Sequence, residues 1–530
     1  MTASASISPK LAAAIAVFVA GLVLLALAVP VALLLVRRRQ VSPAQDQVVR
    51  LLQNSAVPFA IQLINQAINL VFGLILYRLL LDAAISDFIF AAFITTLLLA
   101  TIAEWGLNIY LTREVARDTE AIQRTFGTAL LLRFGLAALV IPVSLLIVQS
   151  YNGLQQAGLI AYGFNREGLW LMLILAATVL PGALSAAVTA LFLATERPIV
   201  PAVVNLMTNI VSALLKTGAL VLGWGVLGVA WAALLASIAG AAMFAILLRR
   251  NWGWPGIRFD RALAVTMLRA GWPLMLNSLL LAVFFRFDVA IIKAVRATDL
   301  PAYDAAYKYL TLTQILPPIV INAVFPMFAR QAANDRAALQ RAYSYLVRLL
   351  LLLALPIAMG TTIVAPWLIT IYGAQHVPLG APALALLIWY LPLSYVNGMT
   401  QYVLIALDRP RTITLSFVAA AIFNLVFNLL FVGRFGIQAA ALATVLSEVV
   451  LFLPLWKVLR AEIEPVPLWR LAWRPALAAL GMGLCMLLAA QVHVALSVLV
   501  GPLAFWGLLV LVGAVQEEDR RLARRVLRRA

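Results

Sequence analysis

The amino-acid sequence predicts an all-α polytopic membrane protein built from two repeated halves, and three observations support this. Of its 530 residues 64% are hydrophobic and 11% are charged, whereas a soluble protein carries about 25% charged residues. Apolar runs recur along the whole chain, and each is long enough, at roughly 20 residues, to cross a hydrocarbon core. Parts of the first half also recur in the second, which indicates an internal duplication.

The hydropathy pattern predicts one leading helix and fourteen further crossings. They span approximately residues 11–36, 55–77, 87–109, 125–149, 169–193, 199–222, 226–248, 270–294, 308–329, 344–368, 381–405, 413–432, 436–456, 475–492 and 495–515. The leading helix ends in three arginines and lies outside the repeated region. A cleaved signal peptide is the alternative interpretation. Cleavage would leave those arginines outside, so we expect a retained anchor with its N-terminus outside.

The distribution of positive charge predicts the topology. The formal net charge is +18, with 39 Lys and Arg residues. If 37–54 lies in the cytoplasm, most of them fall in inward-facing loops and in the charged C-terminal tail, which is the positive-inside bias. We therefore expect a multi-pass protein of the cell (inner, cytoplasmic) membrane with a cytoplasmic C-terminus. The charge also favours contact with anionic membrane lipids, and it does not require nucleic acid as a partner.

The duplication is clearest in a short turn sequence. Ala194-Thr195-Glu196-Arg197-Pro198 returns 212 residues later as Ala406-Leu407-Asp408-Arg409-Pro410. Two weaker matches have nearly the same offset: 225–230 with 436–441, and 87–93 with 301–307. This offset contains six crossings, an even number, so the two copies should be parallel and related by a pseudo-two-fold axis along the membrane normal.

The repeat predicts four divisions of the chain. These are an extra N-terminal transmembrane anchor (1–47), a six-helix N-lobe (48–260), a six-helix C-lobe (261–470), and a segment of two extra helices with a basic cytoplasmic tail (471–530). No predicted outward loop is long enough for a folded domain.

Catalytic and metal-binding signals are missing from the sequence. The chain has one cysteine, Cys485, and two distant histidines, His376 and His493, which excludes an internal disulfide and gives no metal constellation. No carboxylate pair or Ser/His/Asp arrangement stands in an outward loop. We therefore expect no cofactor, no metal and no enzymatic activity.

Several predicted crossings carry polar residues at helical spacing. The candidates for substrate binding are Asn65, Asn69, Asn209, Asn397 and Gln401. For any single residue, an interhelical hydrogen bond is the simpler explanation. Their spread over helices of both halves favours a shared polar cavity, because polar groups in spanning helices usually face other helices or water.

Charged residues inside the crossings are fewer and more specific. Arg133, Lys216 and Arg286 are cations, and an anionic ligand such as a phosphate or carboxylate would offset the cost of burying them. Buried ion pairing is the alternative for Arg133 and Lys216, and a local pair with Asp288 is the alternative for Arg286. That pairing is disfavoured, since residues at i and i+2 lie on different faces of a helix.

Three carboxylates are candidates for ion coupling, namely Glu104, Asp288 and Glu448. Glu104 also fits an ordinary interfacial carboxylate, and Glu448 fits a buried ion pair. A charged residue whose counterpart in the other half is uncharged is not explained by the packing that both halves share, which favours a functional role for it. Lys216 corresponds to about Asn428, Glu448 to about Ser237, and Arg286 to about Gly73.

The chain resembles the multidrug/oligosaccharidyl-lipid/polysaccharide exporter superfamily, and within it the Wzx-type flippases of the polysaccharide transport branch. The residues that carry the resemblance are Asn54, Arg78-Leu79-Leu80, Phe88 through Ala92, Glu104-Trp105-Gly106-Leu107 with Arg113, the two Arg-Pro turns, Arg286 with Asp288, Tyr303 through Tyr307, and Pro326-Met327-Phe328-Ala329-Arg330. The likeness covers about residues 48–515. Two positions depart from the usual pattern: Glu104 stands where such flippases show Asp, and Leu-Leu follows Arg78 in place of Leu-Gly.

The resemblance implies a function by alternating access. Two six-helix lobes in a V shape would flip a polyprenyl-diphosphate-linked oligosaccharide from the inner to the outer leaflet for surface polysaccharide biosynthesis. The cationic cavity would hold the diphosphate or acidic sugars, and H⁺ or Na⁺ could couple through Glu104, Asp288 or Glu448. The alternatives are a cation-coupled multidrug exporter, a lipid II flippase, and, from another class, a polytopic glycosyltransferase.

Overall fold

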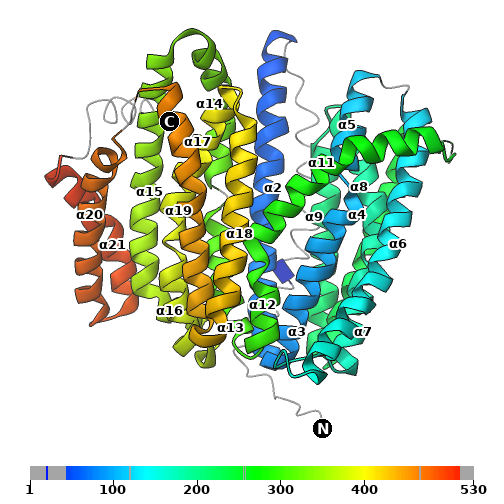
Figure 1. Cartoon of the computed structure of the whole chain (residues 1–530), viewed down its shortest axis with the longest axis horizontal. Helices are drawn as coiled ribbons and strands as arrows, with labels where there is room; N and C mark the ends of the chain where they lie inside the picture. The colour runs from blue at the N-terminus through cyan, green and yellow to red at the C-terminus, as the bar shows by residue number, and fades with distance from the viewer. Residues whose placement is uncertain are drawn as a thin grey trace. The chain divides into compact units, whose positions relative to one another are not determined.

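The computed structural model describes residues 20–21, 43–118, 121–254, 256, 258–314, 316–464 and 467–513. Within these ranges the side chains of 43–56, 121 and 316–323 are not described. The expected anchor at 11–36, apart from Ala20 and Gly21, and the basic tail at 516–530 lie outside the described residues. The described part is helical and has no β-strand (Figure 1), which confirms the predicted all-α class.

Most of the predicted crossings are present as helices. In the described part of the chain, 13 stretches of helix are long and apolar enough to span a membrane, so this is a multi-pass membrane protein. Each corresponds to one predicted crossing between residues 55 and 515. The prediction for 308–329 has no such match: the segment is divided between the helices Leu300–Thr313 and Leu316–Asn334, neither of which is among the 13.

The helices pack as two compact units, Met1–Thr298 and Asp299–Ala530. Unit 1 contains α2 (Pro43–Leu79), α3 (Asp82–Ala92), the π-helix η1 (Phe93–Leu99), α4 (Ala100–Glu104), α5 (Leu107–Arg117), α6 (Ala121–Gln156), α7 (Arg166–Ala177), α8 (Val179–Ala194), α9 (Ile199–Val221), α10 (Gly225–Trp252), α11 (Arg261–Arg286) and α12 (Asp288–Arg296). The sequence repeat assigns α11 and α12 to the C-lobe, whereas their packing contacts belong to unit 1. The division into lobes at residue 260 remains a prediction about the repeat.

Unit 2 contains the rest of the described chain. Its elements are α13 (Leu300–Thr313), α14 (Leu316–Asn334), α15 (Arg336–Thr370), the short η2 (Ala374–His376), α16 (Val377–Leu387), α17 (Tyr390–Ala406), α18 (Pro410–Phe435), α19 (Ile437–Glu462), α20 (Leu468–Ala490) and α21 (Val494–Leu511). The last two helices pair with each other and both contact α15 (Figure 1).

Apolar side chains fill the contacts between the helices of unit 1. One cluster joins α5, α6, α8 and α10 and includes Leu111, Phe126, Leu191 and Phe244, each at most 1% exposed. A second cluster joins α2 to α9. In a bilayer such contacts are held by close packing, because lipid offers the same side chains an equally apolar surface.

Corresponding helix pairs pack in the same way in the two units. In unit 1, α8 and α9 both pack on α10, and in unit 2, α17 and α18 both pack on α19. Gly225 begins α10 with a φ of 62°, and Gly436 precedes α19 with a φ of 68°. Both positions need a positive φ, which glycine tolerates. This explains why a glycine begins both segments in the sequence match of 225–230 with 436–441.

The two Arg-Pro turns are also the same structure. Glu196 and Asp408 have φ values of 58° and 60°, and each ends a helix in the left-handed conformation. In both turns the amide of the following arginine donates to the carbonyl five residues back, at 2.8 Å. This is the helix-ending Schellman arrangement. Pro198 is the N-cap of α9, and Pro410 is the first residue of α18, where the fixed φ of proline suits the start of a helix.

The arginines of these turns connect neighbouring helix ends. The Arg197 guanidinium donates to Asn251 Oδ1 at 3.5 Å, and the Arg409 guanidinium binds Glu462 Oε1 at 2.7 Å. Asn251 and Glu462 also correspond in the repeat. The turn arginines therefore have a local structural function at the ends of α10 and α19.

Candidate functional site

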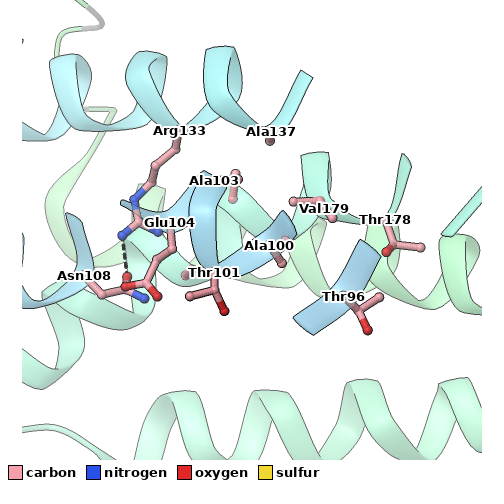
Figure 2. A pocket seen from close by; sticks show the side chains of 13 residues that line it. Thr96, Ala100, Thr101, Ala103, Glu104, Asn108, Arg133, Ala137, Thr178 and Val179 are labelled. Atoms are coloured by element: carbon pink, nitrogen blue, oxygen red, sulfur yellow. Dashed lines mark hydrogen bonds between the residues drawn. The ribbon is translucent and has the colours of Figure 1, made fainter. Parts of the chain in front are cut away.

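The first cavity of unit 1, here called the Arg133 cavity, has a volume of about 370 Å³ and lies between α4, α5, α6 and α8. Its wall includes Glu104, Asn108 and Arg133 among small residues such as Ala103 and Gly182. Figure 2 shows the Arg133 side chain extending from α6 toward Glu104 and Asn108. Two of the predicted site residues, Glu104 and Arg133, are thus brought together.

Arg133 is held by an amide and faces a carboxylate. Its side chain is 2% exposed, and its Nη2 donates to Asn108 Oδ1 at 2.5 Å. Glu104 lies close enough to act electrostatically on the guanidinium. Arg133 Nε has no hydrogen-bond partner among the described residues. A buried arginine is costly unless its donors are satisfied, so this nitrogen marks an incompletely paired cation at the cavity wall.

A break between α4 and α5 sets the positions of Glu104 and Asn108. Trp105 and Gly106 between them both have positive φ, at 51° and 69°. α11 packs against this break: Trp105 Nε1 donates to Leu268 O at 3.0 Å. A Cβ on Gly106 would lie 2.6 Å from Gly271 O, so the close approach requires a glycine. This explains the Glu-Trp-Gly sequence as a structural motif that presents Glu104 to the cavity.

The second cavity, the Lys216 cavity, measures about 440 Å³ and lies between α3, α7, α8, α9 and α10. Lys216 on α9 lines it together with Asn209. The Lys216 ammonium lies 5.5 Å from the centroid of the Phe72 ring. Among the residues whose side chains the structure describes, no hydrogen bond or ion pair to this ammonium is found. Asn209 Nδ2 donates to Asn65 Oδ1 at 2.8 Å, which joins two more of the predicted residues.

The two cavities adjoin. Thr96, Thr178 and Gly182 line both of them. Thr96 belongs to the π-helical segment η1, where the hydroxyl donates to Ala92 O at 2.7 Å. A π-helical segment widens the helix locally and often occurs at functional sites. Arg133, Glu104 and Lys216 therefore line one continuous polar region inside unit 1.

Unit 2 holds its own buried polar cluster around Glu448, which is 2% exposed. Asn397 Nδ2 donates to Glu448 Oε2 at 2.6 Å and to the Glu448 carbonyl at 2.9 Å. Nearby, Asn424 Nδ2 donates to Ser447 Oγ at 3.1 Å, and Asn428 Nδ2 donates to Asn424 Oδ1 at 2.9 Å. These contacts use the amide N–H groups, while Asn397 Oδ1 and Asn428 Oδ1 find no hydrogen-bond partner among the described residues.

The remaining predicted residues lie elsewhere. Asn69 is exposed on α2, and Gln401 is partly exposed on α17; neither lines the two cavities. Arg286 ends α11 and Asp288 begins α12, with Phe287 between them. Asp288 is 2% exposed. Neither of these two residues lines the Arg133 or the Lys216 cavity.

One buried ion pair was missed by the sequence analysis. Lys293 Nζ binds Asp87 Oδ1 at 2.5 Å, with side chains 5% and 15% exposed. Lys293 also lies 5.2 Å from the centroid of the Phe164 ring. Asp87 and Lys293 are more than two hundred residues apart, and each stands near a predicted helix end. Nothing local in the sequence indicated that they meet.

The described residues contain no group of three or more His, Cys, Asp or Glu side chains that could hold a metal ion. The ligand chemistry of unit 1 comes from the side chains that line its continuous polar region. Two cations and one carboxylate line it, and uncharged hydroxyls and amides surround them. Such a set can bind an anion by charge-assisted hydrogen bonds and can exchange a proton or a cation at Glu104.

Solved structures share this fold. A lipid II flippase, MurJ, in an inward closed conformation aligns with a TM-score of 0.68 and 14% identity, covering 86% of this chain and 98% of that one. An inward-facing multidrug resistance MATE family transporter of the MOP superfamily aligns with a TM-score of 0.60 and 18% identity, covering 77% and 98%. At these identities the likeness concerns the fold.

Sequence comparisons identify the family through one family model. A curated relative, the "probable low-salt glycan biosynthesis flippase Agl15" of Haloferax volcanii, is 25% identical over 162 residues, which are 30% of this chain and 34% of the relative. The chain thus matches about a third of the length of that relative. The MatE family model matches residues 273–430. The model described as "Polysaccharide biosynthesis protein" matches residues 51–332, more than half of the 530 residues, and the chain therefore belongs to the polysaccharide biosynthesis protein family.

Proposed function

We propose that this protein flips a polyprenyl-diphosphate-linked oligosaccharide from the inner to the outer leaflet of the cell membrane, by alternating access. The observation that carries the proposal is the pair of adjoining cavities in unit 1, which hold Arg133 and Lys216 within membrane-spanning helices. Family membership and the glycan biosynthesis flippase among the relatives support it. In this proposal the protein is a transporter and not an enzyme.

The charges of the cavities favour an anionic substrate. Arg133 and Lys216 give the polar region two cations against one carboxylate, Glu104. Cationic drugs would meet repulsion there, which argues against a multidrug exporter. A diphosphate, by contrast, would offset the desolvation of both cations. Cavities of about 370 and 440 Å³ suit a charged headgroup and its first sugars, while the lipid tail stays in the bilayer.

Glu104 is the carboxylate that we propose for ion coupling. It lines an open cavity and faces Arg133, so a proton or Na⁺ arriving at Glu104 would change the charge that the substrate meets. Glu448 is closed in by Asn397, and Asp288 lines neither cavity. The orientation of the cycle, with inward loops in the cytoplasm, follows from the positive-inside bias of the sequence.

Transport by the purified protein in liposomes tests the proposal. A fluorescent polyprenyl-diphosphate oligosaccharide is placed in one leaflet, and its arrival in the other is measured with a glycan-cleaving enzyme outside. Arg133→Gln should slow flipping about tenfold or more, because a charge-assisted contact is worth about 1.5–3 kcal/mol. Arg434→Gln is the control, since Arg434 is exposed on α18 and lines neither cavity.

Two outcomes would reject the proposal. One is an equal rate for the wild type, Arg133→Gln and Arg434→Gln, which would separate the cavity from transport. The other is efficient movement of lipid II or of a cationic drug in the same liposomes with none of the lipid-linked oligosaccharide.

A further inference from the structure

A third cavity lies in unit 2, between α15 and the start of α20. Its volume is about 360 Å³, and it is lined by Arg348, Trp469, Arg470, Leu471, Trp473, Arg474 and Pro475. Three of these seven residues are arginines, and none is acidic. Arg348 is 7% exposed, so one of the cations is buried in the wall. Three cations around one cavity give it a positive potential, which favours an anionic ligand.

The helix geometry adds to the positive potential. Arg470 and Arg474 stand in the first two turns of α20, which begins at Leu468. The N-terminal end of a helix carries a partial positive charge and free backbone N–H groups, so cations there are unfavourable and anions are favoured. Ordinary helix design would place arginines at the opposite end. The arrangement therefore suits an anionic ligand better than it suits the isolated helix.

Two tryptophans set the depth of this cavity in the membrane. Trp469 is 66% exposed and Trp473 is 41% exposed. The Arg470 and Arg474 guanidinium carbons lie 5.5 and 5.2 Å from the centroids of the adjacent Trp469 and Trp473 rings. Exposed tryptophans beside arginines at the end of a spanning helix are typical of the headgroup level of a bilayer.

Below the cavity, α20 presents exposed apolar side chains. α20 packs on α15 and on α21 (Figure 1), and Leu477, Leu480 and Leu484 on it are exposed. This apolar surface continues from the cavity into the predicted hydrocarbon region, as an acyl chain attached to a headgroup would require. The charge pattern of the sequence also predicts that this end of α20 is cytoplasmic, where anionic lipids are enriched.

We propose that Arg348, Arg470 and Arg474 form a binding site for the phosphate headgroup of an anionic phospholipid, between α15 and α20. The exposed leucines of α20 would contact its acyl chains. The volume of about 360 Å³ is at the lower end for small-molecule sites and fits a headgroup. Arg474 also donates to Gly513 O at 2.8 Å, so the same residue connects the lipid site to the end of α21.

Lipid retention by the purified full-length protein tests this site. Native mass spectrometry in detergent is titrated with dioleoylphosphatidylglycerol, dioleoylphosphatidylcholine or inorganic phosphate. Phosphatidylglycerol should bind saturably and phosphatidylcholine should not. Arg470→Gln should weaken that binding about fivefold, because one basic residue near the headgroup is worth about a factor of five. Arg470→Lys should weaken it less, since the charge remains.

The matched control is Arg411→Gln. Arg411 is also exposed in the first turn of its helix, α18, but does not line the cavity. Equal loss in Arg411→Gln and Arg470→Gln would overturn the site. Equal competition by inorganic phosphate alone would overturn the assignment to a lipid, and preferential retention of an added polyprenyl diphosphate would overturn the assignment to a phospholipid. Flipping through unit 1 is measured separately, so either proposal can fail without the other.

Discussion

The two units of this protein place their polar residues in opposite ways on the same helix pairs. In unit 1, Ser185, Ser237 and Lys216 line an open cavity of about 440 Å³. In unit 2, the corresponding positions are Asn397, Glu448 and Asn428, which are buried. Asn397 and Glu448 bind each other. Two serines leave the space that an amide and a carboxylate fill in the other copy.

This difference separates framework from site. The turns at Arg197 and Arg409 are alike because both copies need the same helix ending. The cavity-lining positions differ: Ser185 and Ser237 border the Lys216 cavity, whereas Asn397 and Glu448 are buried. The comparison supports the proposal that the ligand binds in unit 1 and that the Glu448 cluster serves packing. Each prediction below changes a residue in unit 1, in unit 2, or at the matching position in both.

The largest effect is expected at Lys216. Lys216→Asn gives unit 1 the residue found at the corresponding position of unit 2. Flipping of a lipid-linked oligosaccharide should fall at least about tenfold, because one charge-assisted contact to the substrate is lost. Thermal stability should not fall, since no described partner is left unpaired. The control variant Lys457→Asn, at an exposed position of α19, should flip the substrate at the normal rate. An equal loss of flipping in this control would contradict a specific role for Lys216 in the cavity.

The next effect separates the two glutamates. Glu104→Gln should abolish the response of flipping to a proton or sodium gradient, because the amide cannot take up either cation. Glu448→Gln should retain that response within about twofold, since glutamine can keep a hydrogen bond to Asn397 in the same volume. The measurement is the flipping rate with and without each gradient. Loss of the response in Glu448→Gln alone would exchange the roles of the two residues.

A smaller effect concerns stability. Glu448→Ser places the residue of unit 1 in unit 2 and removes the carboxylate that Asn397 Nδ2 binds, leaving that amide only the backbone carbonyl at the same position. The loss should be about 1–3 kcal/mol, because a buried hydrogen bond to the carboxyl group is removed and the larger side chain is no longer there to fill its volume. Ser237→Ala in unit 1 removes a hydroxyl that donates to Thr178 O at 3.1 Å and should cost about 1 kcal/mol or less. Reversible unfolding in mixed micelles measures both, and equal losses would contradict a structural role specific to Glu448.

The smallest effect is expected at the turns. Arg409→Gln removes an ion pair with Glu462, and Arg197→Gln removes a long contact with Asn251. The Arg409 side chain is 56% exposed, and exposed pairs contribute about 0–1 kcal/mol. Stability should therefore fall by less than about 1 kcal/mol in the first variant and less still in the second, with flipping unchanged in both. A marked loss of flipping would mean that these arginines do more than join helix ends.

Much of the fold could be predicted from the sequence because its signals are local. Runs of apolar residues predict spanning helices, and the repeated Arg-Pro turns predict repeated helix ends. The crossing expected at 270–294 is displaced, since α11 begins at Arg261 and the helix breaks at Phe287. The amphipathic start of α11 hides its true beginning from a hydropathy criterion.

The site could be predicted only in part. Arg133, Lys216 and Glu104 became candidates because charged residues are costly inside a membrane-spanning helix unless they face a partner or a functional site. The partner of Arg133 could not be identified, since Asn108 reaches it only through the left-handed break at Trp105 and Gly106. The contact of Asp87 with Lys293 depends on tertiary packing. The Lys216 cavity itself depends on Ser185 and Ser237 being small, and no single-residue signal reveals an empty volume.

The most direct test compares one serine from each unit. Ser237→Cys and Ser447→Cys are made in a Cys485→Ala background, which removes the one native cysteine. Ser237 lines the Lys216 cavity, whereas Ser447 is fully buried in the Glu448 cluster. A negatively charged methanethiosulfonate reagent should label Ser237→Cys rapidly, and a polyprenyl-diphosphate oligosaccharide should protect it, while Ser447→Cys stays unlabelled. Equal labelling of both variants, or no protection of Ser237→Cys, would contradict the assignment of the substrate site to unit 1.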